Sequence, residues 1–290
     1  MNFSTIFLIQ IIITVLFSIL AAILDYRNNI VPDELTYTLL FFGLISNLIL
    51  SIITTNIKFI LASFISMTIT YIITYLLWKL NMWGGGDVML FTAIATVIPS
   101  GLNIDFLNIF PQLSIYPFSL SVVVNSILVS FPFLVIFIFR LFIKNGIFKN
   151  NPKNMISLLN IEILRGLIKS TLNKTIPIKD LKEGNVVNDY YFDNEYVIEL
   201  INDIEESNLK VYKSKDDSIG KYYFKSQTGG GITKGDMYLI KILSAQNFIG
   251  NEISVKVTYP FTPSISAGLL IAVFFGDIMF LFVKNLVLVI

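Results

Sequence analysis

The stretch FSTIFLIQIIITVLFSILAAIL, residues Phe3–Leu24, decides the fold class of this sequence. It contains no charged residue. As an α-helix rising about 1.5 Å per residue, it matches a hydrocarbon core about 30 Å thick. The run lacks the basic segment that precedes the apolar part of a secretory signal peptide, and it is longer than that part usually is. We therefore expect a membrane helix that the mature protein retains.

The rest of the chain has a similar apolar character. Of its 290 residues, 54% are hydrophobic and only 14% are charged, whereas about 25% are charged in typical soluble domains. We therefore expect an α-helical polytopic membrane protein with six transmembrane helices. Besides Phe3–Leu24, the predicted spans are Leu35–Ile53, Phe59–Trp78, Val88–Ile98, Phe118–Phe139 and Phe261–Val289.

The run Val88–Ile98 is too short to cross a bilayer by itself, because a spanning helix needs about 20 residues. Two interpretations stay open. Either the following stretch, Gly101–Tyr116, completes the span, or the segment is partly re-entrant, which is tolerated where the irregular backbone is buried in protein.

A polar segment precedes the last apolar run. Charged residues and asparagines are mixed there with aromatic residues, which predicts a small mixed α/β soluble domain inserted between the fifth and sixth helices. The predicted organisation has three parts. Residues 1–144 contain the first five helices, 145–259 form the soluble domain, and 260–290 contain the last helix.

Local patterns predict individual elements of this insert. Ile156–Lys169 has apolar residues at helical spacing, and Thr233 with Asp236 is typical of the start of a helix over Met237–Ser244. Three further stretches are rich in residues that favour strands. They are Tyr196–Ile201, Lys221–Phe224 and Ile253–Tyr259.

The positions of lysine and arginine predict the orientation, because cytoplasmic loops are enriched in these residues. Arg27, Lys79 and the basic residues of 140–256 fall in connections on one side of the membrane. The other side has little beyond Lys58 and Lys284. We therefore expect a multi-pass protein of the cell membrane, with the soluble domain cytoplasmic and both termini external.

The sequence contains neither cysteine nor histidine, which excludes disulfides, thiol nucleophiles, histidine-based triads and the usual zinc ligands. The groups that remain for catalysis are carboxylates, lysines, hydroxyls and the backbone. Asp203, Asp216 and Asp217 lack the ligand spacing of an EF-hand calcium site. We expect no metal, no cofactor and no nucleic-acid partner, although the net charge of +1 does not itself decide the last point.

Two aspartates lie at the same predicted edge of the membrane. Asp25 directly follows the first apolar run, and Asp87 precedes the fourth within WGGGDVML, Trp83–Leu90. Two nearby carboxylates do not ionise together easily and share one proton. One can then take a proton from water while the other protonates a carbonyl oxygen. The pair therefore predicts hydrolysis of a peptide bond.

Each acid alone has a simpler interpretation. Asp87 after Gly84–Gly86 is typical of an acid that caps a helix, and Asp25 beside Arg27 is typical of an interfacial ion pair. Next to a catalytic acid, the glycines would instead allow unusual backbone conformations and the close approach of a substrate peptide. The matching side and depth of the two acids favour the catalytic interpretation.

The two motifs together resemble those of the type IV prepilin peptidases and archaeal preflagellin peptidases. The residues that carry the resemblance are Gly84-Gly85-Gly86-Asp87, which fits a Gly-x-Gly-Asp pattern, and Asp25-Tyr26-Arg27 followed by Ile30-Val31-Pro32 and Leu35-Thr36. The resemblance covers about residues 15–145. Weaker similarity follows at Pro177–Gly184, Gly231–Lys234 and Tyr259–Pro263.

This resemblance implies a six-helix aspartic endopeptidase that removes a short basic leader, a class III signal peptide, on the cytoplasmic side. It implies that Asp25 and Asp87 are the catalytic pair, and that Gly84, Gly85 and Gly86 shape the loop that presents Asp87 to the substrate. Archaellin or pilin-like precursors and membrane lipids would be the partners. Bacterial members carry paired cysteines and also methylate their product, so the absence of cysteine favours the archaeal type without methylation.

Two other functions stay open. Presenilin-like intramembrane proteases also use a Gly-x-Gly-Asp motif, but Pro260–Pro263 lacks the Pro-Ala-Leu element that such enzymes carry later in the chain. A transporter that moves protons or ions through Asp25 and Asp87 would also use acids in a membrane, although no inverted repeat supports it.

Other acids are assigned structural roles. Asp33 and Glu34 fit the first turn of a helix after Pro32, with binding of a basic leader as the alternative. Asp277 lies in the last apolar run at an external depth. We expect it to reach the membrane interface or to pair with Lys284.

Overall fold

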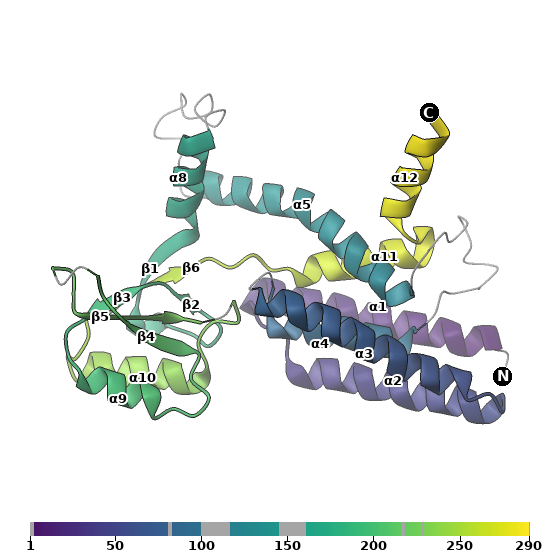
Figure 1. Ribbon diagram of the computed structural model, residues 1–290, viewed down its shortest axis with the longest axis horizontal. Helices are drawn as coiled ribbons and strands as arrows, with labels where there is room; N and C mark the ends of the chain where they lie inside the picture. Colours follow the sequence, from purple (N-terminus) through teal and green to yellow (C-terminus); the bar gives the residue numbers. More distant parts are fainter. Residues whose placement is uncertain are drawn as a thin grey trace. The chain divides into compact units, whose positions relative to one another are not determined.

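The computed structural model describes residues 3–80, 83–99, 117–144, 161–215, 218–227 and 229–289 (Figure 1). The chain divides into two compact units. Met1–Leu134 and Pro260–Ile290 make up the first, and Val135–Tyr259 makes up the second. Each unit has its own hydrophobic core.

The first unit is helical. Its helices are α1 (Phe3–Asn28), α2 (Asp33–Ile53), α3 (Lys58–Lys79), α4 (Gly85–Val97), α5 (Phe118–Lys144), α11 (Thr262–Phe275) and α12 (Ile278–Val289), of which α5 continues into the second unit. Helices α1, α2, α3 and α5 are long and apolar enough to cross a membrane, whereas α4 and α11 are shorter apolar helices. Large apolar side chains such as Leu16, Phe41 and Ile52 are exposed on the long helices, as expected of surfaces that face lipid.

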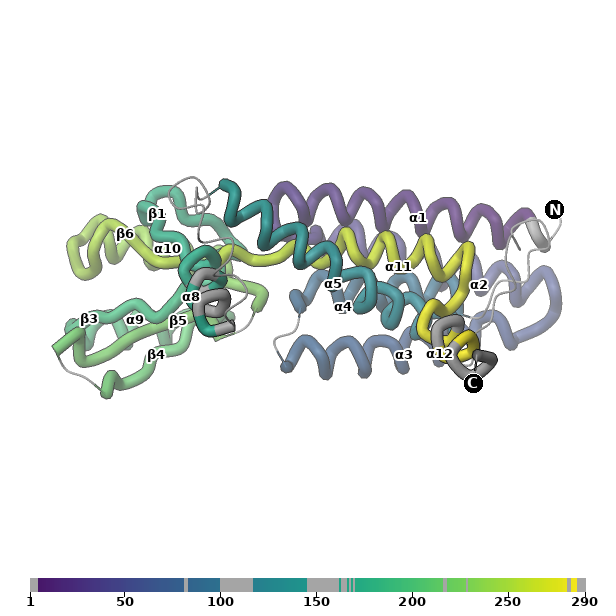
Figure 2. Tube along the Cα trace, turned by 90° about the horizontal axis from the view of Figure 1, so that it is seen from above, coloured from purple at the N-terminus to yellow at the C-terminus, as the bar shows by residue number. Residues whose placement is uncertain are grey.

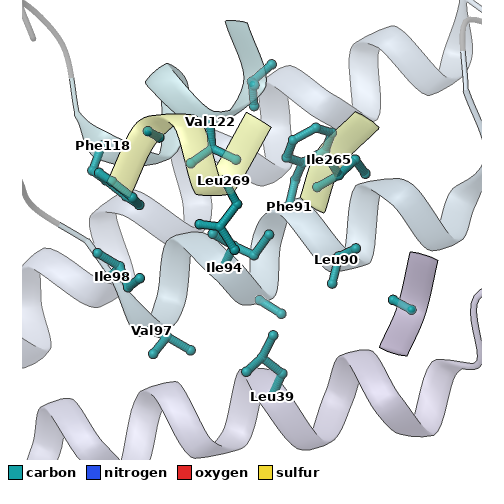
Figure 3. Close-up of a cluster of buried hydrophobic side chains, with 14 of the residues drawn as sticks. Leu39, Leu90, Phe91, Ile94, Val97, Ile98, Phe118, Val122, Ile265 and Leu269 are labelled. Carbon is teal, nitrogen blue, oxygen red and sulfur yellow. The ribbon is translucent and has the colours of Figure 1, made fainter. Parts of the chain in front are cut away.

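Helix α4 lies in the core of the first unit. Nearly all of its residues are buried, and α1, α2, α3 and α11 pack against it. Figure 3 shows Ile94 of α4 between Leu39 of α2 and Leu269 of α11. A helix that is hydrophobic all round is either a buried helix or a membrane span, and α4 is buried among other helices of its unit.

The C-terminal end of α4 is buried, and its free carbonyl groups therefore need partners from other elements. The Nδ2 of Asn47 on α2 lies 2.9 Å from the main-chain oxygen of Thr96 and 3.2 Å from that of Val97. The hydroxyl of Ser63 on α3 also donates to Thr96, at 2.6 Å. These side chains explain how α4 ends inside the unit. The stretch Gly101–Tyr116, predicted as a possible completion of this span, lies outside the described residues.

The last predicted span, Phe261–Val289, is not one helix. Gly276 has a φ of +76°, a left-handed conformation that glycine adopts without steric penalty, and it separates α11 from α12. Asn125 of α5 bonds to both sides of the break. Its Nδ2 donates to the main-chain oxygen of Gly276 at 2.8 Å, and its Oδ1 accepts from the N–H of Ile278 at 3.1 Å.

Asp277 lies at this break and is fully buried. One of its oxygens accepts the N–H of Phe280 at 3.2 Å in the first turn of α12, which is the geometry of a helix-capping acid. The other oxygen has no hydrogen-bond partner. Within the described residues Asp277 forms no ion pair with Lys284, so the predicted pairing of these two residues is wrong.

The second unit combines two three-stranded antiparallel sheets with short helices. One sheet has the order β1 (Asn173–Pro177), β6 (Glu252–Lys256), β2 (Val186–Val187), and the other has the order β3 (Tyr190–Phe192), β5 (Tyr222–Ser226), β4 (Leu209–Lys213). The helices are α8 (Ile161–Leu172), the 3₁₀ helix η1 (Ile178–Asp180), α9 (Tyr196–Asn202) and α10 (Lys234–Ala245). Helices α9 and α10 lie on the same side of the strands (Figure 1), and Val197, Phe224 and Ile240 are fully buried in the core of this unit.

Sequence patterns predict four of these elements correctly: α8, α10, β5 and β6. Thr233 is the N-cap of α10, β5 and β6 overlap two predicted strands, and α8 is the described part of the predicted Ile156–Lys169 helix. The predicted strand Tyr196–Ile201 is wrong, because these residues form α9. Val197 and Ile201 are the buried residues of α9, and a spacing of four residues defines one face of a helix.

Candidate functional site

Asp25 lies in the last turn of α1 and is only 8% exposed. The helix ends just beyond it, where Asn29 has a left-handed backbone (φ 56°) and donates its N–H to the main-chain oxygen of Asp25 at 2.7 Å. This is a common way for a helix to end. The carboxylate Oδ2 of Asp25 accepts the main-chain N–H of Thr262 at 3.1 Å. Arg27 is exposed, and in the part of the chain that the structure describes it forms no ion pair with Asp25.

Asp87 is the third residue of α4 and is 7% exposed. Its Oδ2 accepts the main-chain N–H of Gly84 at 3.0 Å, which satisfies one of the free amides at the start of the helix. Its Oδ1 accepts the hydroxyl of Thr262 at 2.9 Å. The N-cap of α4 is Gly84 and not Asp87. Asp87 supports the helix start from its third position through one carboxylate oxygen, while the other oxygen bonds to a different helix.

Thr262 thus contacts both predicted site acids, through its main chain at Asp25 and through its side chain at Asp87. It is the first residue of α11, where the main-chain N–H has no partner within the helix. The N-terminus of a helix also carries partial positive charge, which favours anions. Helices α1 and α11 run side by side (Figure 2). The N-terminal end of α11 therefore lies next to the C-terminal end of α1.

Three aromatic rings pack next to these contacts. The Trp83 ring lies 5.1 Å from that of Phe261 and 5.3 Å from that of Phe91, measured between centroids. The indole N–H of Trp83 donates to the main-chain oxygen of Thr74 at 3.1 Å. Trp83 directly precedes Gly84, and Phe261 directly precedes Thr262. The packed rings therefore help to fix the segments that contain Gly84 and Thr262, the two residues that donate hydrogen bonds to Asp87.

The glycines before Asp87 do not adopt the unusual backbone conformations that the sequence predicted. None of Gly84, Gly85 and Gly86 has a positive φ, so the backbone freedom of glycine is not used here. At Gly86 the reason for glycine is space, because a Cβ there would lie 2.9 Å from the Cβ of Val31. Gly84 and Gly85 have no such close neighbour.

The other acids considered from the sequence lie elsewhere. Asp33 and Glu34 are exposed in the first turn of α2, after Pro32, as predicted. Asp277 lies at the break before α12. Within the described ranges, no three acidic side chains gather as a metal site would require; Asp216 and Asp217 are outside those ranges.

Sequence reasoning missed Thr262 as a site residue. It lies within Tyr259–Pro263, which carries a weak family similarity, and a threonine followed by proline is typical of the start of a helix. These signals indicate a helix start. Such signals do not show which carboxylates, far away in the sequence, the first residue of the helix contacts.

These features define a helical membrane protein in which two buried aspartates share a hydrogen-bonding partner. Residues 12–139, which include both aspartates and the glycine stretch, match the profile of the type IV leader peptidase family. The chain is also 32% identical over 136 residues to the prepilin peptidase EppA of Methanothermobacter thermautotrophicus. That match covers 46% of this chain, which spans only about a third (35%) of the length of the relative. The two matches confirm the family resemblance inferred from the motifs.

Proposed function

We propose that the protein is an aspartic endopeptidase in which Asp25 and Asp87 activate water to cleave a peptide bond. The observation that carries this proposal is their common partner, because Thr262 hydrogen-bonds to both carboxylates. Two acids from different helices are thereby held around one residue in a buried site. The family match over residues 12–139 independently favours a peptidase.

In the proposed reaction, the two carboxyl groups hold one proton between them. The ionised group takes a proton from water, and the protonated group gives its proton to the carbonyl oxygen of the substrate. The water oxygen bonds to the carbonyl carbon, which gives a diol. The newly protonated carboxyl group then gives its proton to the amide nitrogen while the other carboxylate takes a proton from the diol, the carbon–nitrogen bond breaks, and an acid and an amine leave. The pair retains one proton for the next cycle.

We further propose that the substrates are precursors with class III signal peptides, such as archaellins or pilin-like proteins. The similar protein from Methanothermobacter thermautotrophicus is a prepilin peptidase, which supports this substrate class. Arg27 and Lys79 occupy the last turns of α1 and α3, which supports a cytoplasmic position for that end of both helices. In this topology both termini are external. The apolar segment of the precursor lies among the lipids while its leader reaches Asp25 and Asp87.

The proposal is tested by co-expressing the full chain with such precursors and sequencing the N-termini of the products. We expect cleavage just before the hydrophobic segment. Asp25→Asn and Asp87→Asn should each abolish cleavage, because an amide of the same shape can neither take nor give the required proton. Asp180→Asn, at an exposed acid of the second unit, should leave cleavage unchanged and serves as the control.

Other results would indicate the other functions. Cleavage inside the hydrophobic segment would favour a presenilin-like protease. Proton flux in reconstituted vesicles without any cleavage would favour a transporter. Normal processing by either membrane-inserted Asp25→Asn or Asp87→Asn would contradict the assignment of the pair.

A further inference from the structure

We propose that Thr262 is a positioning residue that holds the two carboxylates of the site in the arrangement needed to share a proton. This inference rests on the proposed function of Asp25 and Asp87. It adds a residue from the far end of the chain, outside the matched range 12–139.

The contacts of Thr262 are those of a bridge between two acids. Its hydroxyl donates to Asp87 at 2.9 Å and its main-chain N–H donates to Asp25 at 3.1 Å, both within the usual range for hydrogen bonds. Thr262 itself is fully buried, so water does not readily replace its hydroxyl. A hydroxyl has one hydrogen to donate, and the hydroxyl oxygen of Thr262 lies 2.9 Å from Oδ1 of Asp87.

Two features fix Thr262 in place. Phe261, on its N-terminal side, packs on Trp83 and Phe91. Pro263, on its C-terminal side, has a φ suited to the first turn of a helix and no N–H of its own. Thr262 therefore supplies the main-chain donor at the very start of α11, and this donor cannot swing away without moving the aromatic cluster.

Three other buried threonines of this unit behave differently. The hydroxyls of Thr14, Thr92 and Thr96 each donate to a main-chain oxygen of their own helix at 2.7 Å. The hydroxyl of Thr262 instead crosses to a carboxylate on another helix. Thr92 lies on α4, the same helix as Asp87, and is also buried, which makes it a matched control.

The test compares Thr262→Val, which keeps the shape and loses the hydroxyl, with Thr262→Ser, which keeps a hydroxyl. The control is Thr92→Val. We expect Thr262→Val to lower kcat about 10- to 100-fold with KM changed less than about 2-fold, because the acids lose their alignment while the substrate still binds. The pH profile of kcat/KM should also be displaced. Thr262→Ser should restore both, and Thr92→Val should change neither.

A second measurement tests the contact without any substrate. Thr262→Val should lower the melting temperature of the detergent-solubilised protein. In an Asp87→Leu background, where the acceptor is absent, the same substitution should lower it much less. Equal shifts in both backgrounds would overturn the proposed contact.

The two proposals fail in different ways. If Asp25→Asn and Asp87→Asn abolish cleavage while Thr262→Val has the kcat and pH profile of Thr92→Val, the inference on Thr262 is wrong and the proposed function stands. If Asp25→Asn or Asp87→Asn cleaves normally, the proposed function is wrong. The melting-temperature comparison then still decides whether Thr262 holds Asp87.

Discussion

Gly86 and Val31 are in such close contact that a Cβ on Gly86 would lie 2.9 Å from the Cβ of Val31. Val31 follows Asp25 in the first motif, and Gly86 precedes Asp87 in the second. The backbone of one motif therefore packs directly against the other. This contact helps to set the relative position of the two aspartates.

We expect Gly86→Ala to destabilise the protein by about 1–3 kcal/mol, which is typical of an extra methyl group forced into a packed site. Cleavage of a precursor should fall as well, because the added group pushes Asp87 away from Asp25. Gly85→Ala is the matched control, since its Cβ would meet its nearest neighbour, the Trp78 indole nitrogen, at 3.9 Å. Thermal unfolding in detergent and N-terminal sequencing measure the two effects. Equal stability and activity of the two variants would contradict this account.

Part of the fold is predictable because its signals are local. The apolar runs at α1, α2, α3 and α5 predict helices from composition and length alone, and Thr233 predicts the start of α10 from capping chemistry. Asp25 and Asp87 are conspicuous because both lie at the same predicted edge of the membrane and one of them follows a run of three glycines. Each of these signals lies within a stretch of sequence about as long as one helix.

The remaining features depend on contacts between distant segments. Thr262 is 237 positions from Asp25 and 175 positions from Asp87 in the sequence, and no spacing rule predicts such contacts. The break at Gly276 is held by Asn125 from another helix. The position of α4 in the core follows from the helices around it, because its apolar sequence fits a lipid-facing span equally well.

A substitution of Asn47 tests whether its side chain stabilises the buried C-terminal end of α4. Asn47→Asp keeps the shape of the side chain but removes the donor to Thr96 and Val97. We expect a loss of about 1–3 kcal/mol or more, because buried carbonyl groups lose a partner and now face a carboxyl group. Thermal unfolding in detergent measures the loss. Thr38→Val, at an exposed hydroxyl that bonds within its own helix, is the control, and a loss as large for Thr38→Val would refute the explanation.

Substitutions of Gly276 and Asn125 test what stabilises the break between α11 and α12. Gly276→Ala should destabilise the protein by about 1–2 kcal/mol, because a side chain is strained at a positive φ. Asn125→Leu should be at least as destabilising, since it removes partners from the main chain on both sides of the break. Gly166→Ala, where an added Cβ would meet nothing within 4 Å, should have little effect. If Gly276→Ala is as stable as the unmodified protein in thermal unfolding, the left-handed turn is not required.

A substitution of Asp236 tests how much its buried carboxylate stabilises the second unit. It is fully buried and accepts the hydroxyl of Ser207 at 2.7 Å, the N–H of Asn208 at 3.0 Å, and both the N–H and the hydroxyl of Thr233 at 2.9 Å. Asp236→Asn turns one acceptor into a donor that faces other donors. We expect a loss on the order of 3 kcal/mol, because bonds to a charged group are stronger and buried donors are left unpaired.

The matched control for Asp236 is Glu183→Gln, which affects an exposed ion pair with Lys234 at 3.8 Å. Exposed pairs contribute about 0–1 kcal/mol, so this variant should be nearly as stable as the unmodified protein. Hydrogen exchange of the full chain measures both, because local opening of β4, β5 and α10 appears as faster exchange of their amides. Faster exchange is expected for Asp236→Asn alone. Equal exchange in the two variants would mean that the buried carboxylate does not hold the Ser207–Asn208 turn to the start of α10.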